Sequence, residues 1–266
     1  GGFISERTGL SKGRVKDAMN KGAVWVQKER GKMYRLRRAT APLTAGDRLQ
    51  FYYDQVVLAL RPPEGRCLSD KGHYSAWYKP SGLLSQGTLY GDHCSLMRQA
   101  ELSFNPRRLI FVVHRLDREA SGIMLLAHSR NAAERLSELF RHNRIMKMYR
   151  AEVLGNPGGK RQKGTIDFPL DGKPCLTEFK VESYHPGNNT SIVTVMIETG
   201  RFHQIRRHFA MAGFPVLGDP GYGKGNKNSD GLKLSSVSLR FFCPFQNREM
   251  EFSMSETTGS MPHHLE

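Results

Sequence analysis

Charged residues crowd the short segment between two apolar runs of the sequence. Arg115, Asp117 and Glu119 follow the run 111–113 and precede the run 123–126. Charged side chains that are held against apolar strands are either paired or functional, because their desolvation otherwise costs several kcal/mol. A carboxylate in such a place can act as a base or as a nucleophile. The alternative is a tight charged turn on a solvated edge, and the periodicity alone does not choose between the two.

The elements around this turn are expected to build a mostly antiparallel sheet. Both apolar runs have the length and residue types of strands that are covered on both faces. Helical spacing of apolar residues predicts amphipathic helices over 131–142 and 203–211. Further strands are predicted over 75–78, 147–153, 179–184, 191–197, 239–242 and 250–253, with a short helix over 95–102. Many strands with hairpin-like connections and few helices indicate an α+β fold with a mixed, mostly antiparallel central sheet and flanking helices.

The composition favours a polyanionic partner. The 266 residues include 40 Lys and Arg against 25 Asp and Glu, which gives a formal net charge of +15. Such an excess suits nucleic acid or an anionic membrane surface. No apolar run approaches the roughly 18 residues of a membrane span, so we expect no integral membrane protein. The four cysteines form no Cys-x-x-Cys pair, which argues against zinc or a disulfide framework and fits a reducing cytoplasm.

The N-terminal part, 1–57, reads as a small basic α/β unit. Ser11 can cap a helix that runs to Met19, and short strands are predicted after it over 23–26, 33–37 and 49–53. Residues 58–72 are expected to be a linker, because Pro62, Pro63 and Gly65 break regular structure. The larger domain is then expected to cover 73–257, and 258–266 is expected to be a partly vector-derived tail outside the fold. The chain start has no signal-peptide character.

The basic helix, the segment Lys21–Val26 and the turn Thr44–Leu49 together resemble the alpha-L RNA-binding motif. This resemblance implies that Arg14, Lys16 and Lys21 contact phosphates, with salt-sensitive affinity and no sequence choice. The alternative is an ordinary small α/β unit with a solvated basic face.

Several familiar catalytic and metal sites are absent from the sequence. The glycines of 221–225 follow no strand–helix pattern, so they form no phosphate-binding loop. There is no Gly-x-Ser-x-Gly elbow and no His-Glu-x-x-His pair. His203 and His208 stand five apart without an acidic partner, so no metal site is expected.

Four blocks of the sequence are similar to the RluA-type pseudouridine synthases, in the same order along the chain. They are Tyr78–Leu84, His114–Gly122, Lys147–Ala151, and Glu198–Arg206 with its continuation over 213–220. The resemblance implies the pseudouridine synthase fold, an RNA substrate and an isomerisation of uridine to pseudouridine. This reaction breaks a carbon–nitrogen bond and forms a carbon–carbon bond without net redox change, so no cofactor is implied.

The resemblance also implies roles for single residues. Asp117 corresponds to the catalytic aspartate, Arg206 to the basic residue that pairs with it, and Tyr149 to the tyrosine that packs against the target base. Arg115 would help push the uridine out of the stack, which costs a few kcal/mol. The residues expected to bind substrate are Arg115, His114, Ile205, Arg201 and His203. Whether Asp117 attacks the sugar or removes its proton stays open.

The match has minor departures and leaves alternatives. Ala120 stands where threonine is common, Phe202 where a small polar residue is usual, and 232–236 lacks a histidine often found there. Arg206 with Asp117 could be a plain buried ion pair, and Tyr149 a core aromatic residue. A non-catalytic RNA-binding or ribosome-assembly factor on the same scaffold is the alternative function. A glycosidase would need a second carboxylate facing Asp117. Ribosomal RNA is favoured as the target, and transfer RNA is the second candidate. A monomer is expected.

Overall fold

The computed structural model describes residues 1–223, 226 and 230–254, so the tail expected over 258–266 lies outside them. These residues fall into two compact units. The first consists of Gly1–Glu64 and Leu83–Ile110, and the second of Gly65–Gly82 and the described chain from Phe111 onward.

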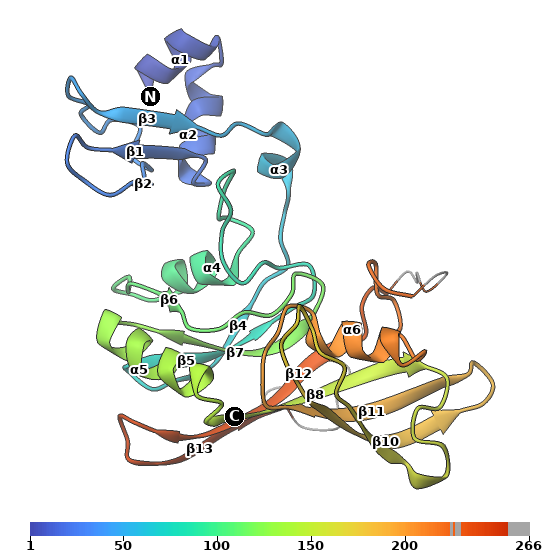
Figure 1. Cartoon of the computed structure of the whole chain (residues 1–266). Helices are drawn as coiled ribbons and strands as arrows, with labels where there is room; N and C mark the ends of the chain where they lie inside the picture. Colours follow the sequence, from blue (N-terminus) through green and yellow to red (C-terminus); the bar gives the residue numbers. More distant parts are fainter. Residues whose placement is uncertain (224–225, 227–229, 255–266) are drawn as a thin grey trace, which may run out of the picture. The chain divides into compact units, whose positions relative to one another are not determined.

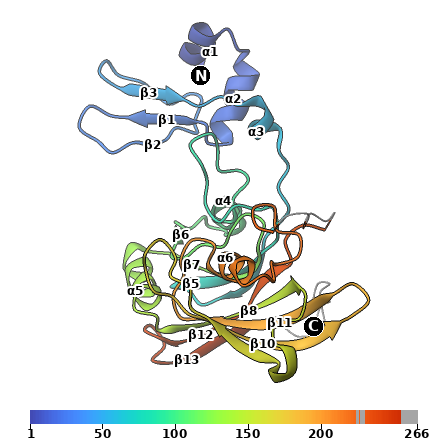
Figure 2. The ribbon, with the colours of Figure 1, turned by 45° about the vertical axis from the view of Figure 1, so that its right-hand side comes forward.

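One mixed sheet forms the frame of the second unit. Its strands follow the order β4-β5-β7-β12-β8-β11-β10-β9, with β13 paired to β12 and β6 paired to β7. The strands are β4 (Arg66–Asp70), β5 (Tyr74–Lys79), β6 (Phe111–Val112), β7 (Ser121–Ala127), β8 (Ile145–Leu154), β9 (Lys163–Ile166), β10 (Thr177–His185), β11 (Thr190–Ile197), β12 (Leu234–Cys243) and β13 (Arg248–Ser253). In Figures 1 and 2, β8, β11 and β10 run side by side. Among these described strands only β7 and β12 pair in parallel, which confirms the mixed, mostly antiparallel α+β fold.

Helix α5 (Arg130–Arg141) covers the strand that follows the charged turn. Ser129 caps α5 by accepting a hydrogen bond from the backbone N–H of Ala132 at 3.1 Å. Ala132 and Leu136 are fully buried against β7, whose residues from Gly122 to Ala127 are all buried. The predicted buried strand and amphipathic helix are therefore confirmed. Helix α6 (Gln204–Met211) packs against β10, and a short 3-10 helix, η1, covers Gly159–Arg161.

Gly122 allows β7 and β12 to approach closely just after the charged turn. Its φ is +118°, a conformation that side chains rarely adopt. A Cβ built there would lie 2.3 Å from the backbone oxygen and 2.4 Å from the backbone nitrogen of Ser236. Because these are backbone atoms of the paired strand, they cannot move aside without disrupting the parallel pair.

The domain boundaries differ from the expected ones in two places. Residues 66–70 of the expected linker form β4, which pairs with β5. The prolines at 62 and 63 do lie outside any helix or strand, so the irregular stretch is shorter than predicted. In addition, Leu83–Ile110 belongs to the same compact unit as the N-terminal residues Gly1–Glu64.

The first unit contains short helices and a three-stranded antiparallel sheet of order β2-β1-β3. Its elements are α1 (Gly2–Thr8), α2 (Lys12–Asn20), β1 (Val24–Gln27), β2 (Tyr34–Arg35), β3 (Arg48–Phe51), α3 (Gln55–Ala59) and α4 (Leu96–Ser103). Ser11 caps α2 as predicted, and Val15 and Met19 of α2 join Val24 and Val26 of β1 in a small core. Helix α1 was not predicted from the sequence.

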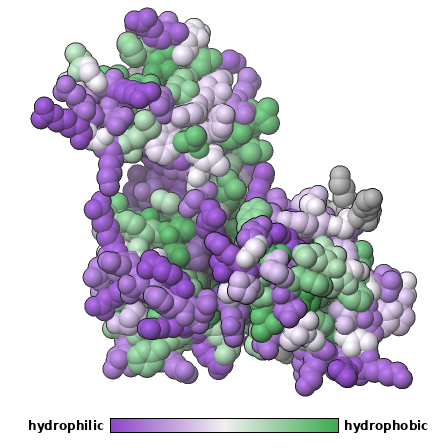
Figure 3. Space-filling model, viewed as in Figure 1, coloured by the Kyte–Doolittle hydropathy of each residue, from purple (hydrophilic) through white to green (hydrophobic). Residues whose placement is uncertain are grey.

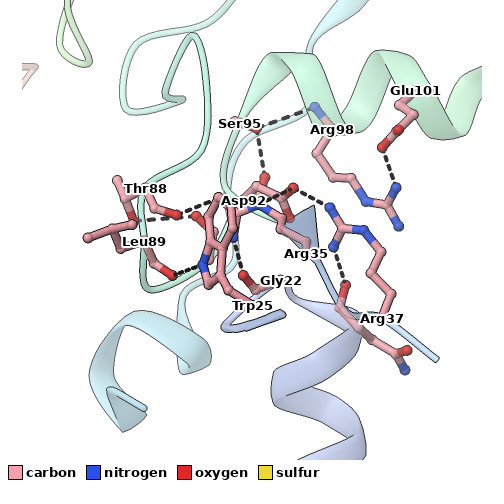
Figure 4. A network of polar contacts seen from close by, with 12 residues as sticks. Gly22, Trp25, Arg35, Arg37, Thr88, Leu89, Asp92, Ser95, Arg98 and Glu101 are labelled. Atoms are coloured by element: carbon pink, nitrogen blue, oxygen red, sulfur yellow. Dashed lines mark hydrogen bonds and ion pairs between the residues drawn. The ribbon is translucent and has the colours of Figure 1, made fainter. Parts of the chain in front are cut away.

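Asp92 holds the segment 83–95 against the N-terminal sheet within this unit (Figure 4). Its carboxylate pairs with Arg37 and lies 3.3 Å from Nε of Arg35. Trp25 donates its indole N–H to the carbonyl of Leu89 at 3.0 Å, and its ring stacks under the Arg35 guanidinium. Burial lowers the pKa of Arg35, and Arg37 lowers it further, whereas Asp92 raises it. Asp92 is thus the counter-charge of two clustered guanidinium groups.

Replacing Asp92 with asparagine will loosen this attachment. The two arginines lose their shared counter-charge, and breaking such a largely buried pair costs about 3 kcal/mol. Backbone amides of 84–96 that are bonded within the unit, such as Asp92 N–H to the carbonyl of Lys21 at 2.9 Å, will exchange with solvent about 100-fold faster or more. Asp17→Asn is the control, because its exposed pair with Lys21 contributes little. Equal exchange in the two variants would contradict the expected role of Asp92.

Hydrophilic residues predominate on the face shown in Figure 3, although hydrophobic residues also reach the surface there. Within the described residues, no helix combines the length and the apolar character that a membrane crossing requires.

Candidate active site

The turn between β6 and β7 carries Asp117, and the segment after β5 holds its backbone. Lys79 donates from Nζ to the carbonyl of Arg118 at 3.2 Å, and the N–H of Gly82 donates to the same oxygen at 2.7 Å. Ser81 adds a hydrogen bond from its hydroxyl to the carbonyl of Glu119 at 2.6 Å. Residues 79–82 therefore hold the backbone of the turn that carries Asp117.

Lys79 is fully buried beneath the turn. Burial lowers its pKa to about 8, although the charges of Asp117 and Glu119 act in the opposite direction. It also donates to the backbone oxygen of Pro80 at 3.1 Å. Lys79 thus serves as an internal support for the residues on either side of Asp117.

Arg206, on α6, joins two carboxylates. Its Nη1 donates to Oδ2 of Asp117 at 3.0 Å, while Nε and Nη2 form a two-point pair with Asp219 at 2.7 and 2.8 Å. The Arg206 side chain is only 3% exposed. Burial alone would lower its pKa, but the hydrogen bonds and charges of Asp219 and Asp117 outweigh burial and raise it. The guanidinium therefore stays charged and fixes one oxygen of Asp117.

A pocket opens where this ion pair meets β8 and the start of α6. The lining residues are Arg115, Leu116, Asp117, Ala120, Tyr149, Ile197, Gly200, Arg201, His203, Gln204, Ile205, Arg206 and Leu234. The structure thus brings together Asp117, Arg206, Tyr149, Arg115, Ile205, Arg201 and His203, seven of the residues singled out from the sequence. Burial, and then the charge of Asp117, raise the pKa of Tyr149, so its hydroxyl stays protonated.

His203 stands at the start of α6 with a left-handed backbone, φ +52°. Its Nε2 lies 3.6 Å from Oδ1 of Asp117, the oxygen that Arg206 does not bind, and its Nδ1 lies 3.1 Å from the hydroxyl of Tyr222. Burial lowers the pKa of His203, Asp117 raises it, and Arg206 lowers it again. A neutral imidazole therefore faces the second carboxylate oxygen at neutral pH.

Comparison with known proteins identifies the family. The sequence profile of the family described as RNA pseudouridylate synthase matches residues 73–211. The chain belongs to this family. It is an RNA pseudouridine synthase, an isomerase that forms pseudouridine in RNA.

Relatives and solved structures agree with this assignment. The synthase is 35% identical over 193 residues to the dual-specificity RNA pseudouridine synthase RluA of Vibrio parahaemolyticus, covering 65% of this chain and 75% of that protein. RluA of Escherichia coli is 34% identical over 166 residues, covering 56% and 73%. In fold, the synthase is similar to human RNA pseudouridylate synthase domain containing 1, with a TM-score of 0.62 and 22% identity over 74% of this chain and 86% of that one.

Asp219 is the main feature of the synthase site that sequence reasoning missed. It lies in the block 213–220, but its role was not predicted. Its side chain is fully buried, and Oδ1 also accepts the backbone N–H groups of Gly221 and Tyr222 at 2.8 and 3.1 Å. The carboxylate thus ties the loop after α6 to Arg206. A lone acid 13 residues beyond a basic residue gives no helical or strand spacing that could have revealed this pair.

Two predicted contact residues have other partners in the structure. His114 accepts the backbone N–H of Leu125 at Nε2, 2.9 Å away, and stacks on Phe140, so it supports the sheet and does not line the pocket. Lys21, in the first unit, donates to Asp17 and to the carbonyl of Leu58, both at 2.8 Å. Its ammonium is engaged inside the unit, whereas Arg14 and Lys16 are exposed on α2.

His114 makes the folded synthase sensitive to acid. Burial, and then the charge of nearby Lys147, lower its pKa from 6.5 to about 3. Between about pH 6.5 and pH 3, His114 binds a proton in the unfolded chain but not in the folded chain. Stability therefore falls as the pH falls. His114→Gln removes this titration and keeps an acceptor for Leu125. As the pH is lowered from 6 to 4, the free energy of unfolding of His114→Gln will increase relative to that of wild type by about 1 kcal/mol per pH unit. Urea unfolding at several pH values measures the difference, and a constant difference would contradict the assignment.

Proposed function

We propose that the synthase extrudes a uridine from structured RNA into the pocket around Asp117 and isomerises it there. The carboxylate opens the reaction either by attacking the sugar or by removing its proton. The carbon–nitrogen glycosidic bond then breaks, the base turns within the pocket, and a ring carbon joins the same sugar carbon. The observation that carries the proposal is the Asp117–Arg206 contact of 3.0 Å inside a pocket that Tyr149 also lines.

The geometry supports distinct roles for the two oxygens of Asp117. Oδ2 is held by Arg206, so Oδ1 is the oxygen available to the sugar. An oriented carboxylate that needs no reorganisation at the moment of reaction is the preorganised arrangement that enzymes use. The role of Arg206 is to hold the reactive carboxylate in position through a charged hydrogen bond.

Tyr149, Ile205 and Arg115 are proposed to receive the extruded base. Tyr149 and Ile205 give the pocket aromatic and apolar walls, which suit the face of a flipped base. Arg115 is exposed on the turn that carries Asp117, and from there it can enter the stack as the uridine leaves. Arg201 and His203 complete the wall at the start of α6.

A hydrolytic alternative has less support. Among the described residues that line the pocket, Asp117 is the only acid. Glycoside hydrolysis by the usual two-carboxylate route needs a second acid facing the first. Asp219 cannot fill this place, because Arg206 and two backbone N–H groups occupy its oxygens.

Structured ribosomal RNA is the proposed target, with transfer RNA as the second candidate. Enzymes of this kind read folded shape and splayed bases. The first unit supports binding to a folded RNA, since Arg14 and Lys16 are exposed on one helix and can contact phosphates. The four cysteines, none of which forms a disulfide in the described structure, support a reducing cytoplasm. We also propose that the synthase acts as a monomer.

Chemical mapping of pseudouridine tests the proposal. Total RNA from cells that lack the gene is incubated with the purified protein and treated with carbodiimide, and reverse-transcription stops are mapped. New stops at defined uridines of ribosomal or transfer RNA are expected, and the same stops will be missing from the deletion strain and present in wild-type cells. The absence of new stops in every RNA would refute the proposed substrate class.

A further inference from the structure

Phe202 presents an aromatic ring to solvent at the rim of the pocket. Its side chain is 65% exposed, although the residues on either side, Arg201 and His203, both line the pocket. A single exposed apolar residue is ordinary on a protein surface. What sets Phe202 apart is the support under its ring.

The ring of Phe202 stacks on the imidazole of His203. Their centroids are 3.7 Å apart and their planes differ by 21°. His203 is itself held from two other sides, by Tyr222 in an edge-to-face contact and by the nearby carboxylate of Asp117. The Phe202–His203 pair is therefore held next to Asp117 and is already oriented before any substrate binds.

The backbone of Phe202 is fixed as well. Its carbonyl accepts a hydrogen bond from Nη1 of Arg207 at 3.5 Å, and Arg207 is anchored by two contacts of 3.0 Å to Asp171. Arg201, the preceding residue, lines the pocket and adds a positive charge there. The rim thus combines a rigid exposed aromatic face with a cation, which is the combination that single-stranded RNA binds.

We infer that Phe202, supported by His203, is a stacking platform for the nucleobase that neighbours the target uridine. Extruding the uridine leaves its neighbours without a stacking partner, and an aromatic side chain at the mouth of the pocket can replace it. The inference rests on the proposed extrusion of the uridine into the Asp117 pocket. The ligand is one unpaired nucleobase in the same RNA strand, and the contact requires no particular base, since every base has a stacking face.

The test uses the whole protein and synthetic RNAs of about twenty nucleotides, each centred on a uridine in a loop of ribosomal or transfer RNA. Further RNAs carry an abasic residue on the 5′ or the 3′ side of that uridine. The variants are Phe202→Ala, Phe202→Trp as the conservative replacement, and Phe242→Ala as a matched control, because Phe242 is 54% exposed on β12 and lies outside the pocket. Fluorescence anisotropy measures binding, and single-turnover assays measure the maximal rate and the half-saturating enzyme concentration.

Phe202→Ala is expected to weaken binding and raise the half-saturating concentration about tenfold. Its maximal rate will stay within about twofold of wild type, because Phe202 does not touch the reacting atoms. Phe202→Trp will bind as wild type does, and so will Phe242→Ala. Wild type will bind one of the two abasic RNAs more weakly than the intact RNA, by a similar factor. Phe202→Ala will bind that abasic RNA almost as tightly as it binds the intact RNA.

Equal losses in wild type and Phe202→Ala for both abasic RNAs would overturn the inference. A fall in maximal rate with unchanged binding would overturn it too, because Phe202 would then act only through His203. Binding and conversion are measured separately. If wild type binds these RNAs more tightly than Phe202→Ala does but converts none of them, the proposed function is refuted and the stacking role of Phe202 is retained.

Discussion

Replacing Asp117 with asparagine will lower the single-turnover rate of pseudouridine formation by about 10⁴-fold or more. The amide has nearly the shape of the carboxylate, and its oxygen can still accept a hydrogen bond from Nη1 of Arg206, 3.0 Å away in the wild type. It carries no charge, however, so it neither attacks the sugar nor removes a proton. The rate is measured with the synthetic RNA at saturating enzyme, by carbodiimide treatment and primer extension.

Binding of RNA separates this result from a general failure of the protein. Asp117→Asn should bind the RNA within a few-fold of wild type, because no phosphate or base contact is removed. Its thermal unfolding should also remain close to wild type. Activity within tenfold of wild type would mean that the reaction does not depend on the Asp117 carboxylate.

The sequence contained enough to predict the elements of the site, but not how distant segments pair. The apolar runs around Asp117 do form strands, and the helix starting near His203 does carry Arg206 into the pocket. The parallel pairing of β7 with β12 joins residues more than 100 positions apart, at Ser121 and Ser235. Strand periodicity shows which face of a strand is buried, and it contains nothing about its neighbour.

Single side chains in the blocks were harder to place than the blocks themselves. His114 stands in the same charged turn as Asp117, yet its ring points to Leu125 and Phe140, because a turn sends adjacent side chains in different directions. Asp219 became a site residue only through the folding of the loop after α6 onto Arg206. Asp92 helps to join Leu83–Ile110 to the N-terminal residues through Arg35 and Arg37, and no local pattern distinguishes this buried carboxylate from a surface acid.

Removing the guanidinium of Arg206 is expected to cost both stability and activity. Arg206→Met leaves the fully buried Asp219 and the reactive Asp117 without their shared partner, and an uncompensated buried charge costs about 3–5 kcal/mol. Arg206→Lys keeps the charge, but one ammonium cannot reproduce a two-point pair with one carboxylate and a third bond to another. Lysine should therefore recover part of the stability and little of the rate.

Arg207 provides the matched control for this prediction. It is the next residue on α6 and also pairs with an aspartate through two contacts of 3.0 Å, but its partner Asp171 is 67% exposed. An exposed pair contributes at most about 1 kcal/mol, so Arg207→Met should unfold in urea almost as wild type does. If Arg206→Met and Arg207→Met lower the free energy of unfolding equally, the bridge between Asp219 and Asp117 does not hold the site together. If Arg206→Met instead loses stability and keeps the wild-type single-turnover rate, the charge on Arg206 is structural, and Asp117 must be positioned by His203 and the turn alone.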